Sequence, residues 1–286
     1  MADALGHAPS GPLPGAVRAL GRAAPPALST RLAARFGAER AALHGAAAVQ
    51  RLWARAMLAL LGVRATLEGE LPRRTVLVVA NHLSYLDILV LARFFPGRFV
   101  AKSEIAGWPV LGWLARAVGT IFVVQARARD VVRVDGEMAR TLAAGVPVLL
   151  FPEGHATRGL DVDRFKSSLL ENAARAEIPC LAAALHYETP ADPWAPAGTV
   201  CWWGGMGFWA HAWNLVGLKR VEARLSLAPE PLVQRDRKIL AEGLRTALLA
   251  RFRPIRQAPV APDWPWRELF ESSGIGQGDA AGVGRS

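Results

Sequence analysis

The chain has 286 residues, 52% of them hydrophobic, which is enough for one large domain or two small ones with a substantial core. Its formal net charge of +10 favours anionic partners, among them anionic lipid and phosphorylated carriers. The basic residues are scattered and no recognised nucleic-acid-binding motif accompanies them, so nucleic acid is not an expected partner. Two cysteines, Cys180 and Cys201, exclude a disulfide framework and have no metal-ligand pattern around them. We expect a reducing, cytosolic compartment, because the first 30 residues also lack the apolar core of a secretory signal.

The N-terminal region divides into an arm and a helix. Residues 1–38 are rich in Ala, Pro and Gly, which predicts a disordered or membrane-surface arm. Residues 40–62 predict a helix with Arg51 and Arg55 on one side. The apolar residues on its other side are Val49, Trp53, Ala56 and Leu60. Such a helix either lies in a membrane interface or packs on the domain with its arginines solvated, and both interpretations stay open.

Short apolar runs alternate with helical patterns over the rest of the chain. Strands are predicted at residues 75–79, 120–124, 146–151, 178–185, 199–203 and 221–227. Helices are predicted at residues 84–95, 105–117, 131–144, 163–176 and 233–252. The alternation predicts an α/β fold with a central, mostly parallel sheet flanked by helices. One domain over residues 39–256, including the N-terminal helix, is followed by a flexible tail, 257–286.

No stretch is predicted to span a membrane. Residues 197–218 carry no formal charge, but glycines, a histidine and an asparagine interrupt them. A span needs about 20 predominantly apolar residues. We therefore interpret this segment as buried or lying in an interface.

The string NHLSYLD places three polar residues directly after the strand predicted at 75–79. In a structural interpretation, Ser84 is a helix N-cap, Asp87 completes the capping pattern, and Asn81 and His82 are ordinary turn residues. In a functional one, Asp87 accepts a hydrogen bond from one ring nitrogen of His82 and leaves the other free as a general base. The two are compatible. Since no Ser or Cys stands out as a nucleophile, His82 is expected to activate a substrate hydroxyl directly.

A second motif, FPEGHATRG, also follows a predicted strand. Pro152 and Gly154 indicate a tight turn, and Gly lets a substrate approach the backbone. Glu153 and Arg158 then lie at the same sheet edge as His82, provided that the strands are parallel. A surface turn with solvated charges is the alternative. In a third string, GTIFVVQARARD, arginines after a strand suit a phosphate or a solvated basic loop.

Together, NHLSYLD, GTIFVVQAR, FPEGHATRG and IPCLAAA resemble, in order and spacing, the blocks of the glycerophospholipid acyltransferase family, which includes the 1-acylglycerol-3-phosphate acyltransferases. The resemblance covers roughly residues 45–230. It implies that His82, oriented by Asp87, deprotonates the hydroxyl of a lysophospholipid. That hydroxyl would attack the thioester of acyl-CoA or of acyl-carrier protein. Neither a cofactor nor a metal is implied.

The resemblance also implies an acceptor-binding site. Its residues would be Asn81, Lys102, Arg127, Phe151, Pro152, Glu153, Gly154 and Arg158. The implied fold is a sandwich of sheet and helices on the cytoplasmic face of the inner (plasma) membrane, monotopic or peripheral, with a tunnel for the acyl chain. Ten tryptophans suit a protein at a membrane interface.

Three positions depart from the family pattern. Gln125 stands where the second block usually has Arg, with Arg127 and Arg129 nearby; His155 replaces a Thr, and Ala182 replaces a Pro. Two of these changes fall in the implied acceptor site. Besides 1-acylglycerol-3-phosphate, another lysolipid such as a lyso-ornithine lipid is therefore a candidate acceptor. A non-catalytic lipid-binding protein is a further alternative, opposed by the intact histidine and aspartate pair.

Overall fold

A computed structural model describes residues 26–107, 112, 115, 116, 119–124, 128–190 and 199–255. The chain divides into two compact units, residues 1–42 and 43–286. The described part of the first unit is helical and belongs to α2 (Pro26–Leu60). Residues 26–38 are thus helical where the sequence suggested an arm, because helix-forming Ala, Leu and Arg dominate them and Pro26 suits a first helical position.

The second unit is built on one seven-stranded sheet with strand order β1-β7-β6-β2-β5-β3-β4. The strands are β1 (Val63–Glu68), β2 (Leu77–Ala80), β3 (Arg98–Lys102), β4 (Ile121–Val123), β5 (Val148–Leu150), β6 (Cys180–Glu188) and β7 (Val221–Leu227). Strands β2 to β6 are parallel to one another, and only the β6–β7 pair is antiparallel. The predicted α/β fold with a mostly parallel sheet is confirmed.

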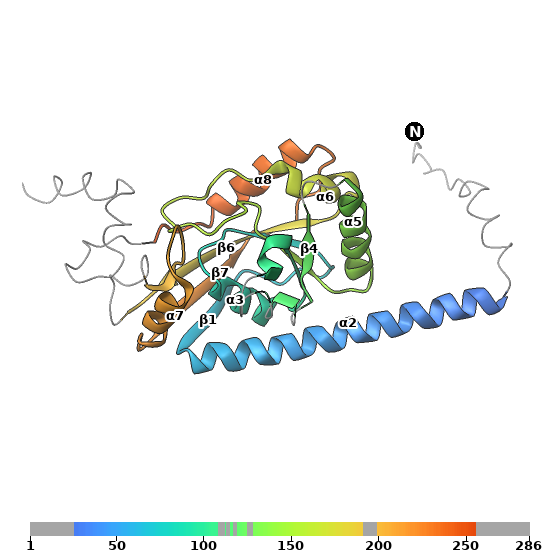
Figure 1. The fold of residues 1–286 in the computed structure, drawn as a ribbon. Helices are drawn as coiled ribbons and strands as arrows, with labels where there is room; N and C mark the ends of the chain where they lie inside the picture. Colours follow the sequence, from blue (N-terminus) through green and yellow to red (C-terminus); the bar gives the residue numbers. More distant parts are fainter. Residues whose placement is uncertain are drawn as a thin grey trace, which may run out of the picture. The chain divides into compact units, whose positions relative to one another are not determined.

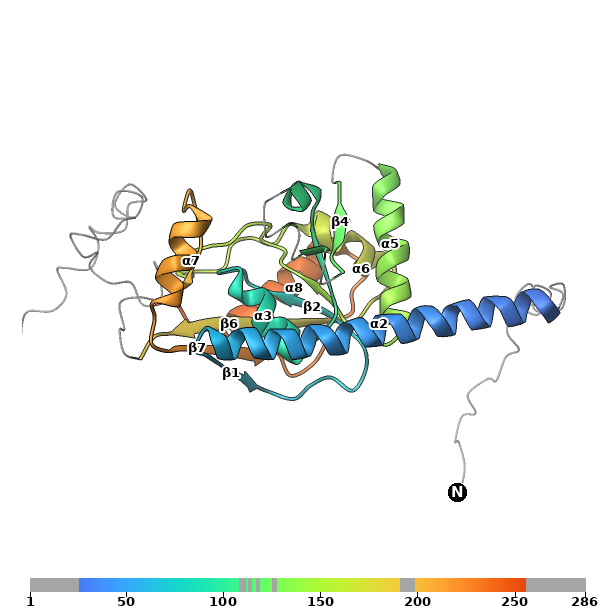
Figure 2. The same cartoon turned by 60° about the horizontal axis from the view of Figure 1, so that its bottom comes forward.

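Helices cover both faces of this sheet (Figure 1). They are α3 (Leu86–Phe94), α5 (Ala128–Ala143), α6 (Glu171–Arg175), α7 (Phe208–Val216) and α8 (Arg237–Leu249), with short 3₁₀ turns η1 (Ser103–Gly107) and η2 (Ser167–Leu170). Figure 1 shows α6 and α8 on one face, and Figure 2 brings forward the other face, which carries α3. Burial on both faces explains why β2 consists of four consecutive buried apolar residues.

Some sequence expectations were wrong, each for a local reason. Strands β1 and β3 were not predicted: β1 alternates buried and exposed residues at the sheet edge, and β3 is bounded by Arg98 and Lys102. Residues 199–203 are not a strand, because the Trp202 N–H bonds the Leu83 carbonyl oxygen at 2.8 Å instead of a sheet neighbour. The helix predicted at 163–176 is limited to η2 and α6. Most of the helix predicted at 105–117 lies outside the described residues.

Helix α2 packs on the sheet domain through residues that the sequence pattern did not single out. Gln50, Ala54 and Leu58 are buried, whereas Val49 and Leu60 are 68% and 77% exposed. The Gln50 amide fixes the helix rotation, since it donates to the Gly97 carbonyl oxygen at 3.0 Å and accepts the Gly97 N–H at 2.8 Å. Of the apolar residues opposite the arginines, Trp53 packs partly against the core, whereas Val49, Ala56 and Leu60 are exposed. Among the described residues, no helix has the length and apolar character that crossing a membrane requires.

Candidate active site

The parallel strands bring the predicted motifs to one edge of the sheet. Val79 of β2 is in register with Leu150 of β5, and Leu150 is in register with Val100 of β3. Because these strands run the same way, the residues that follow them emerge at a common edge. His82, Phe151 and Lys102 each follow or end one of these strands at that edge. The sequence-based expectation that these motifs share an edge is met.

His82 and Asp87 form the hydrogen-bonded pair at the centre of this edge. Asp87 Oδ2 lies 2.7 Å from His82 Nδ1, and the same oxygen accepts the N–H groups of Leu83 at 2.6 Å and Ser84 at 2.9 Å. The Asp87 side chain is fully buried, while that of His82 is 22% exposed. Since a carboxylate only accepts, Nδ1 carries the proton and Nε2 keeps a free lone pair. Asp87 therefore both caps the turn before α3 and orients the imidazole.

Tyr187 is a third member of this group that sequence reasoning missed. Its hydroxyl donates to Asp87 Oδ1 at 2.7 Å, and its side chain is 1% exposed. Burial, followed by the nearby Asp87 carboxylate, raises the pKa of Tyr187 well above its ordinary value, so the hydroxyl stays a donor. The sequence signal that could have identified Tyr187 is its position near the end of β6, a strand that runs parallel to β2.

The buried Glu153 side chain connects the turn that carries His82 to the segment around Asp163. Its Oε1 accepts the His82 N–H at 2.8 Å and its Oε2 accepts the Asp163 N–H at 2.9 Å, and it is 1% exposed. The backbone N–H of Thr157 in turn donates to the His82 carbonyl oxygen at 2.8 Å. Burial raises the pKa of Glu153 to about 7, although its two backbone hydrogen bonds oppose that rise. The N–H and the carbonyl oxygen of His82 are thus both hydrogen-bonded to residues of FPEGHATRG, residues 151–159, which we call the FPEG segment.

Other residues of the FPEG segment shape the surroundings of the imidazole. The Phe151 ring stacks on His82 with centroids 4.1 Å apart and an interplanar angle of 14°. Gly154 has φ +76°, and a Cβ built there would lie 2.7 Å from Lys166 Nζ. The buried Pro152 accepts the Lys166 N–H at 2.9 Å. Gly154 therefore permits both the turn and the close approach of the Lys166 ammonium group, which the sequence did not indicate.

The remaining predicted residues divide by exposure. Asn81 is 1% exposed and its amide is bound to the Leu185 backbone, donating at 3.1 Å and accepting at 2.7 Å, so it ties β2 to β6. Lys102 is half-buried at the end of β3. Arg158 is half-buried, and burial lowers its pKa. Arg127 lies outside the described residues.

An aromatic cluster borders the turn that carries His82, on the side of α7. Tyr85 contacts the rings of Trp202, Phe208 and His211 edge-on. The buried His211 lies 3.0 Å from the Tyr85 hydroxyl through Nδ1 and 3.1 Å from the Cys201 carbonyl oxygen through Nε2. Burial lowers the pKa of His211 to about 4, so this ring is neutral near pH 7. It serves as a structural link between α7 and the turn that carries His82.

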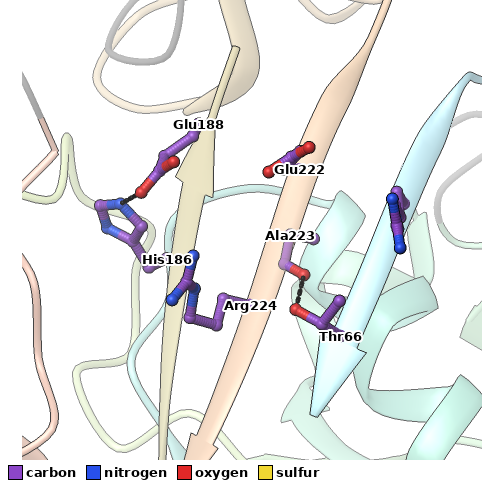
Figure 3. A pocket seen from close by; sticks show the side chains of 7 residues that line it. Thr66, His186, Glu188, Glu222, Ala223 and Arg224 are labelled. Atoms are coloured by element: carbon purple, nitrogen blue, oxygen red, sulfur yellow. Dashed lines mark hydrogen bonds and ion pairs between the residues drawn. The ribbon is translucent and has the colours of Figure 1, made fainter. Parts of the chain in front are cut away.

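A cavity of about 230 Å³ lies elsewhere in the sheet domain, on β1, β6 and β7. Figure 3 shows the side chains that line it. Its histidine, His186, has Nε2 3.1 Å from Glu188 Oε1 and Nδ1 2.9 Å from the Arg253 carbonyl oxygen. Both ring nitrogens therefore face acceptors, and neither is available as a base. Within the described part of the chain, no group of three or more His, Cys, Asp and Glu side chains is placed to hold a metal ion. His186 therefore differs from His82, which has an acceptor on one ring nitrogen alone.

Comparisons with known proteins identify relatives of this chain. The Acyltransferase family model matches residues 62–186. The 1-acyl-sn-glycerol-3-phosphate acyltransferase of Neisseria meningitidis is 32% identical over 179 residues, covering 61% of this chain and 68% of the relative. The lyso-ornithine lipid O-acyltransferase of Pseudomonas aeruginosa is 31% identical over 216 residues, covering 74% and 82%. A crystal structure of the 1-acyl-sn-glycerophosphate acyltransferase of Thermotoga maritima aligns with a TM-score of 0.49 at 22% identity, covering 71% of this chain and 78% of that one.

The chain therefore belongs to the Acyltransferase family. The resemblance drawn from the motifs is confirmed, and the protein is a glycerophospholipid acyltransferase.

Proposed function

We propose that this protein is a membrane-associated O-acyltransferase that acylates the free hydroxyl of a lysophospholipid. The acyl donor is acyl-CoA or acyl-carrier protein, the first-choice acceptor is 1-acylglycerol-3-phosphate, and the product is then phosphatidate. The observation that carries the proposal is the imidazole of His82, whose Nδ1 is held 2.7 Å from Asp87 while its Nε2 is free. A non-catalytic lipid-binding protein has no need for that arrangement.

In the proposed reaction, His82 Nε2 takes the proton of the acceptor hydroxyl as its oxygen attacks the thioester carbonyl carbon. The resulting tetrahedral intermediate collapses with cleavage of the C–S bond, and the imidazolium returns its proton to the departing thiolate. Asp87 stabilises the imidazolium through its hydrogen bond to Nδ1. The acyl group passes directly from thioester to ester without an acyl-enzyme intermediate, and the proposed reaction uses no cofactor besides the donor.

The proposed acceptor site extends from His82 along the FPEG segment and β3. Phe151 forms an apolar wall beside the imidazole. Lys102, Arg158 and Lys166 supply positive charge for the acidic head group, and we propose the same role for Arg127. Asn81, Pro152 and Glu153 are buried, and we propose that they support the acceptor site indirectly, through backbone contacts that hold its turns in place.

A lyso-ornithine lipid is the second candidate acceptor, favoured by two observations. The relatives of that name from Pseudomonas aeruginosa and Rhizobium meliloti align over 74% and 75% of this chain, against 61% for the Neisseria meningitidis protein. In addition, His155 in the FPEG segment pairs with Asp163 at 2.9 Å, which places an exposed His and carboxylate beside the proposed acceptor site. Such a pair suits a zwitterionic head group better than a phosphate.

Exposed apolar side chains support the proposed membrane association. Trp209, Trp213 and Val216 on α7 are 68%, 80% and 63% exposed, at the helical spacing i, i+4, i+7. Tryptophan is favoured at membrane interfaces, and α7 adjoins the turn that carries His82. We propose that the protein works as a peripheral or monotopic protein on the cytoplasmic face of the inner (plasma) membrane, where the acyl thioester donors are present. Acyl-carrier protein, which is acidic, suits the net positive charge.

The test is an acceptor panel with the purified full-length chain. Labelled acyl-CoA and acyl-carrier protein are each offered with 1-acylglycerol-3-phosphate, lyso-ornithine lipid and other lysolipids. We expect ester formation with one acceptor preferred, and we expect binding to vesicles to weaken in the Trp209→Ala/Trp213→Ala variant. Vesicle binding without ester formation on any acceptor would instead identify a lipid-binding protein.

A further inference from the structure

A second cavity, of about 430 Å³, lies at the opposite edge of the sheet from His82. Its walls come from α2 and from segments that lead into three parallel strands: Val76 precedes β2, Pro96 lies two residues before β3, and Pro147 precedes β5. Because parallel strands start at one edge and end at the other, this cavity is separate from the candidate active site. Its volume falls in the range of small-ligand sites.

Hydrogen bonds across this region hold its walls in place. His44 Nε2 lies 2.8 Å from the Ala144 carbonyl oxygen, and the buried Gln50 amide is bound to both backbone groups of Gly97. These contacts join α2 to the segments before β5 and β3. The cavity between them is therefore a defined feature of the fold, not a gap beside a loose helix.

The charged groups of this cavity are all cationic. Arg51, Arg73 and Arg74 line it, and all three are exposed. Neither Asp nor Glu occurs among the described residues of its wall. None of the three arginines has an ion-pair partner elsewhere in the described part of the chain. A guanidinium group binds phosphate through two parallel hydrogen bonds, so three arginines without an ion-pair partner match the chemistry of a phosphorylated ligand.

Apart from His44 and Thr75, the side chains of the rest of the wall are apolar. They include Leu71, Phe94, Phe95, Pro96 and Pro147. Leu71 is 50% exposed, so hydrocarbon is presented to solvent next to the arginines. Inorganic phosphate gains nothing from such a surface, whereas a ligand with both a phosphate and a hydrocarbon chain buries apolar area there.

We propose that this cavity is a second lipid-binding site, which takes an anionic phospholipid with its phosphate among Arg51, Arg73 and Arg74 and its hydrocarbon against Leu71 and the two phenylalanines. The ligand is a phospholipid with an exposed phosphate, such as phosphatidate. Binding there requires neither His82 nor acyl transfer, so the site stands whether or not the proposed acceptor is correct.

A fluorophore attached at the cavity tests the proposal on the full-length protein. The native Cys180 and Cys201 are both buried, so Val49→Cys, at an exposed position next to the lining residue Ala48, provides the accessible thiol for an environment-sensitive dye and keeps every proposed contact. Dihexanoylphosphatidate, below its micelle concentration, should change the emission saturably. The apparent Kd should rise roughly tenfold when two of the guanidinium groups are removed in Arg73→Gln/Arg74→Gln. The same loss of charge in Arg55→Gln/Arg251→Gln, at exposed arginines outside the cavity, should leave the Kd unchanged.

A variant that keeps every charge guards against a purely electrostatic effect. Ala48 lines the cavity from α2, and Ala48→Phe should occupy part of it and weaken phosphatidate binding. The proposal is wrong if the dye does not respond, or if the two double variants weaken binding equally. It is also wrong if inorganic phosphate competes as well as dihexanoylphosphatidate, since the apolar wall would then contribute nothing.

Discussion

The Tyr187 hydroxyl donates a 2.7 Å hydrogen bond to Asp87, the carboxylate that orients His82, across 100 residues of sequence. Asp87 thereby has a donor on each oxygen, with His82, Leu83 and Ser84 sharing Oδ2 and Tyr187 alone on Oδ1. Because both side chains are buried, no bulk water replaces a missing donor. The reactive geometry therefore depends on a residue of β6 as well as on the turn itself.

Tyr187→Phe tests this dependence, since it removes one hydroxyl and keeps the ring. A hydrogen bond to a charged group is worth about 1.5–3 kcal/mol, so we expect kcat to fall roughly tenfold or more with KM little changed. The carboxylate freed on Oδ1 should interact more strongly with the imidazolium, and the acid limb of the pH–rate profile should move to higher pH. Steady-state kinetics across pH measure both effects.

Tyr85→Phe is the matched control, because it also removes a hydroxyl near the turn, but one bonded to His211. We expect a smaller loss of kcat and no movement of the acid limb. If both variants gave the same profile, Tyr187 would be a packing residue only.

Glu153→Gln should change how stability depends on pH. The pKa of Glu153 is raised from 4.5 to about 7, so the folded state binds its proton more tightly than the unfolded state. This contribution is fully present below pH 4.5 and is lost as the pH rises through 7, a change of roughly 3 kcal/mol. Urea unfolding at several pH values should show the wild type losing stability relative to Glu153→Gln between pH 4.5 and 7. A difference independent of pH would contradict the shifted pKa.

His211→Gln should change the pH dependence of stability in the opposite direction. The pKa of His211 is lowered from 6.5 to about 4, so the unfolded state binds the proton first as the pH falls. Its contribution to stability is present above pH 6.5 and is lost as the pH falls through 4, by roughly 3 kcal/mol. Gln keeps a donor for the Cys201 carbonyl oxygen without titrating. Below pH 6.5, the wild type should therefore lose stability relative to the variant, as followed by thermal unfolding; parallel curves would argue against a buried neutral imidazole.

Gly154→Ala should strain the FPEG turn. A φ of +76° costs a residue with a Cβ about 1–2 kcal/mol, and the new methyl group would press on Lys166 Nζ. We expect a loss of stability of that size and a lower kcat, because Glu153 beside it holds the His82 backbone. Gly205→Ala is the control, since a Cβ there meets nothing within 4 Å. Equal effects of both substitutions on unfolding and turnover would show that the positive φ of Gly154 and its contact with Lys166 impose no particular requirement for glycine.

The sequence predicted those features that depend on local chemistry. Apolar strands followed by polar turns predicted the shared sheet edge, and the five-residue spacing predicted the His82–Asp87 contact. Contacts between distant segments could not be predicted in this way. Tyr187 bonds Asp87, 100 residues away, and Glu153 bonds His82, 71 residues away, and only the strand order brings these residues together. The sequence left open how α2 packs for a similar reason, since a polar residue, Gln50, holds the helix through the Gly97 backbone.

The most direct test of the account is acyl transfer by His82→Ala on the preferred acceptor, measured with labelled acyl-CoA beside vesicle binding. Removal of a general base typically costs 10²–10⁴-fold in rate. We predict a loss of about that size with vesicle binding intact. Turnover equal to that of the wild type would contradict the assignment of His82 as the base.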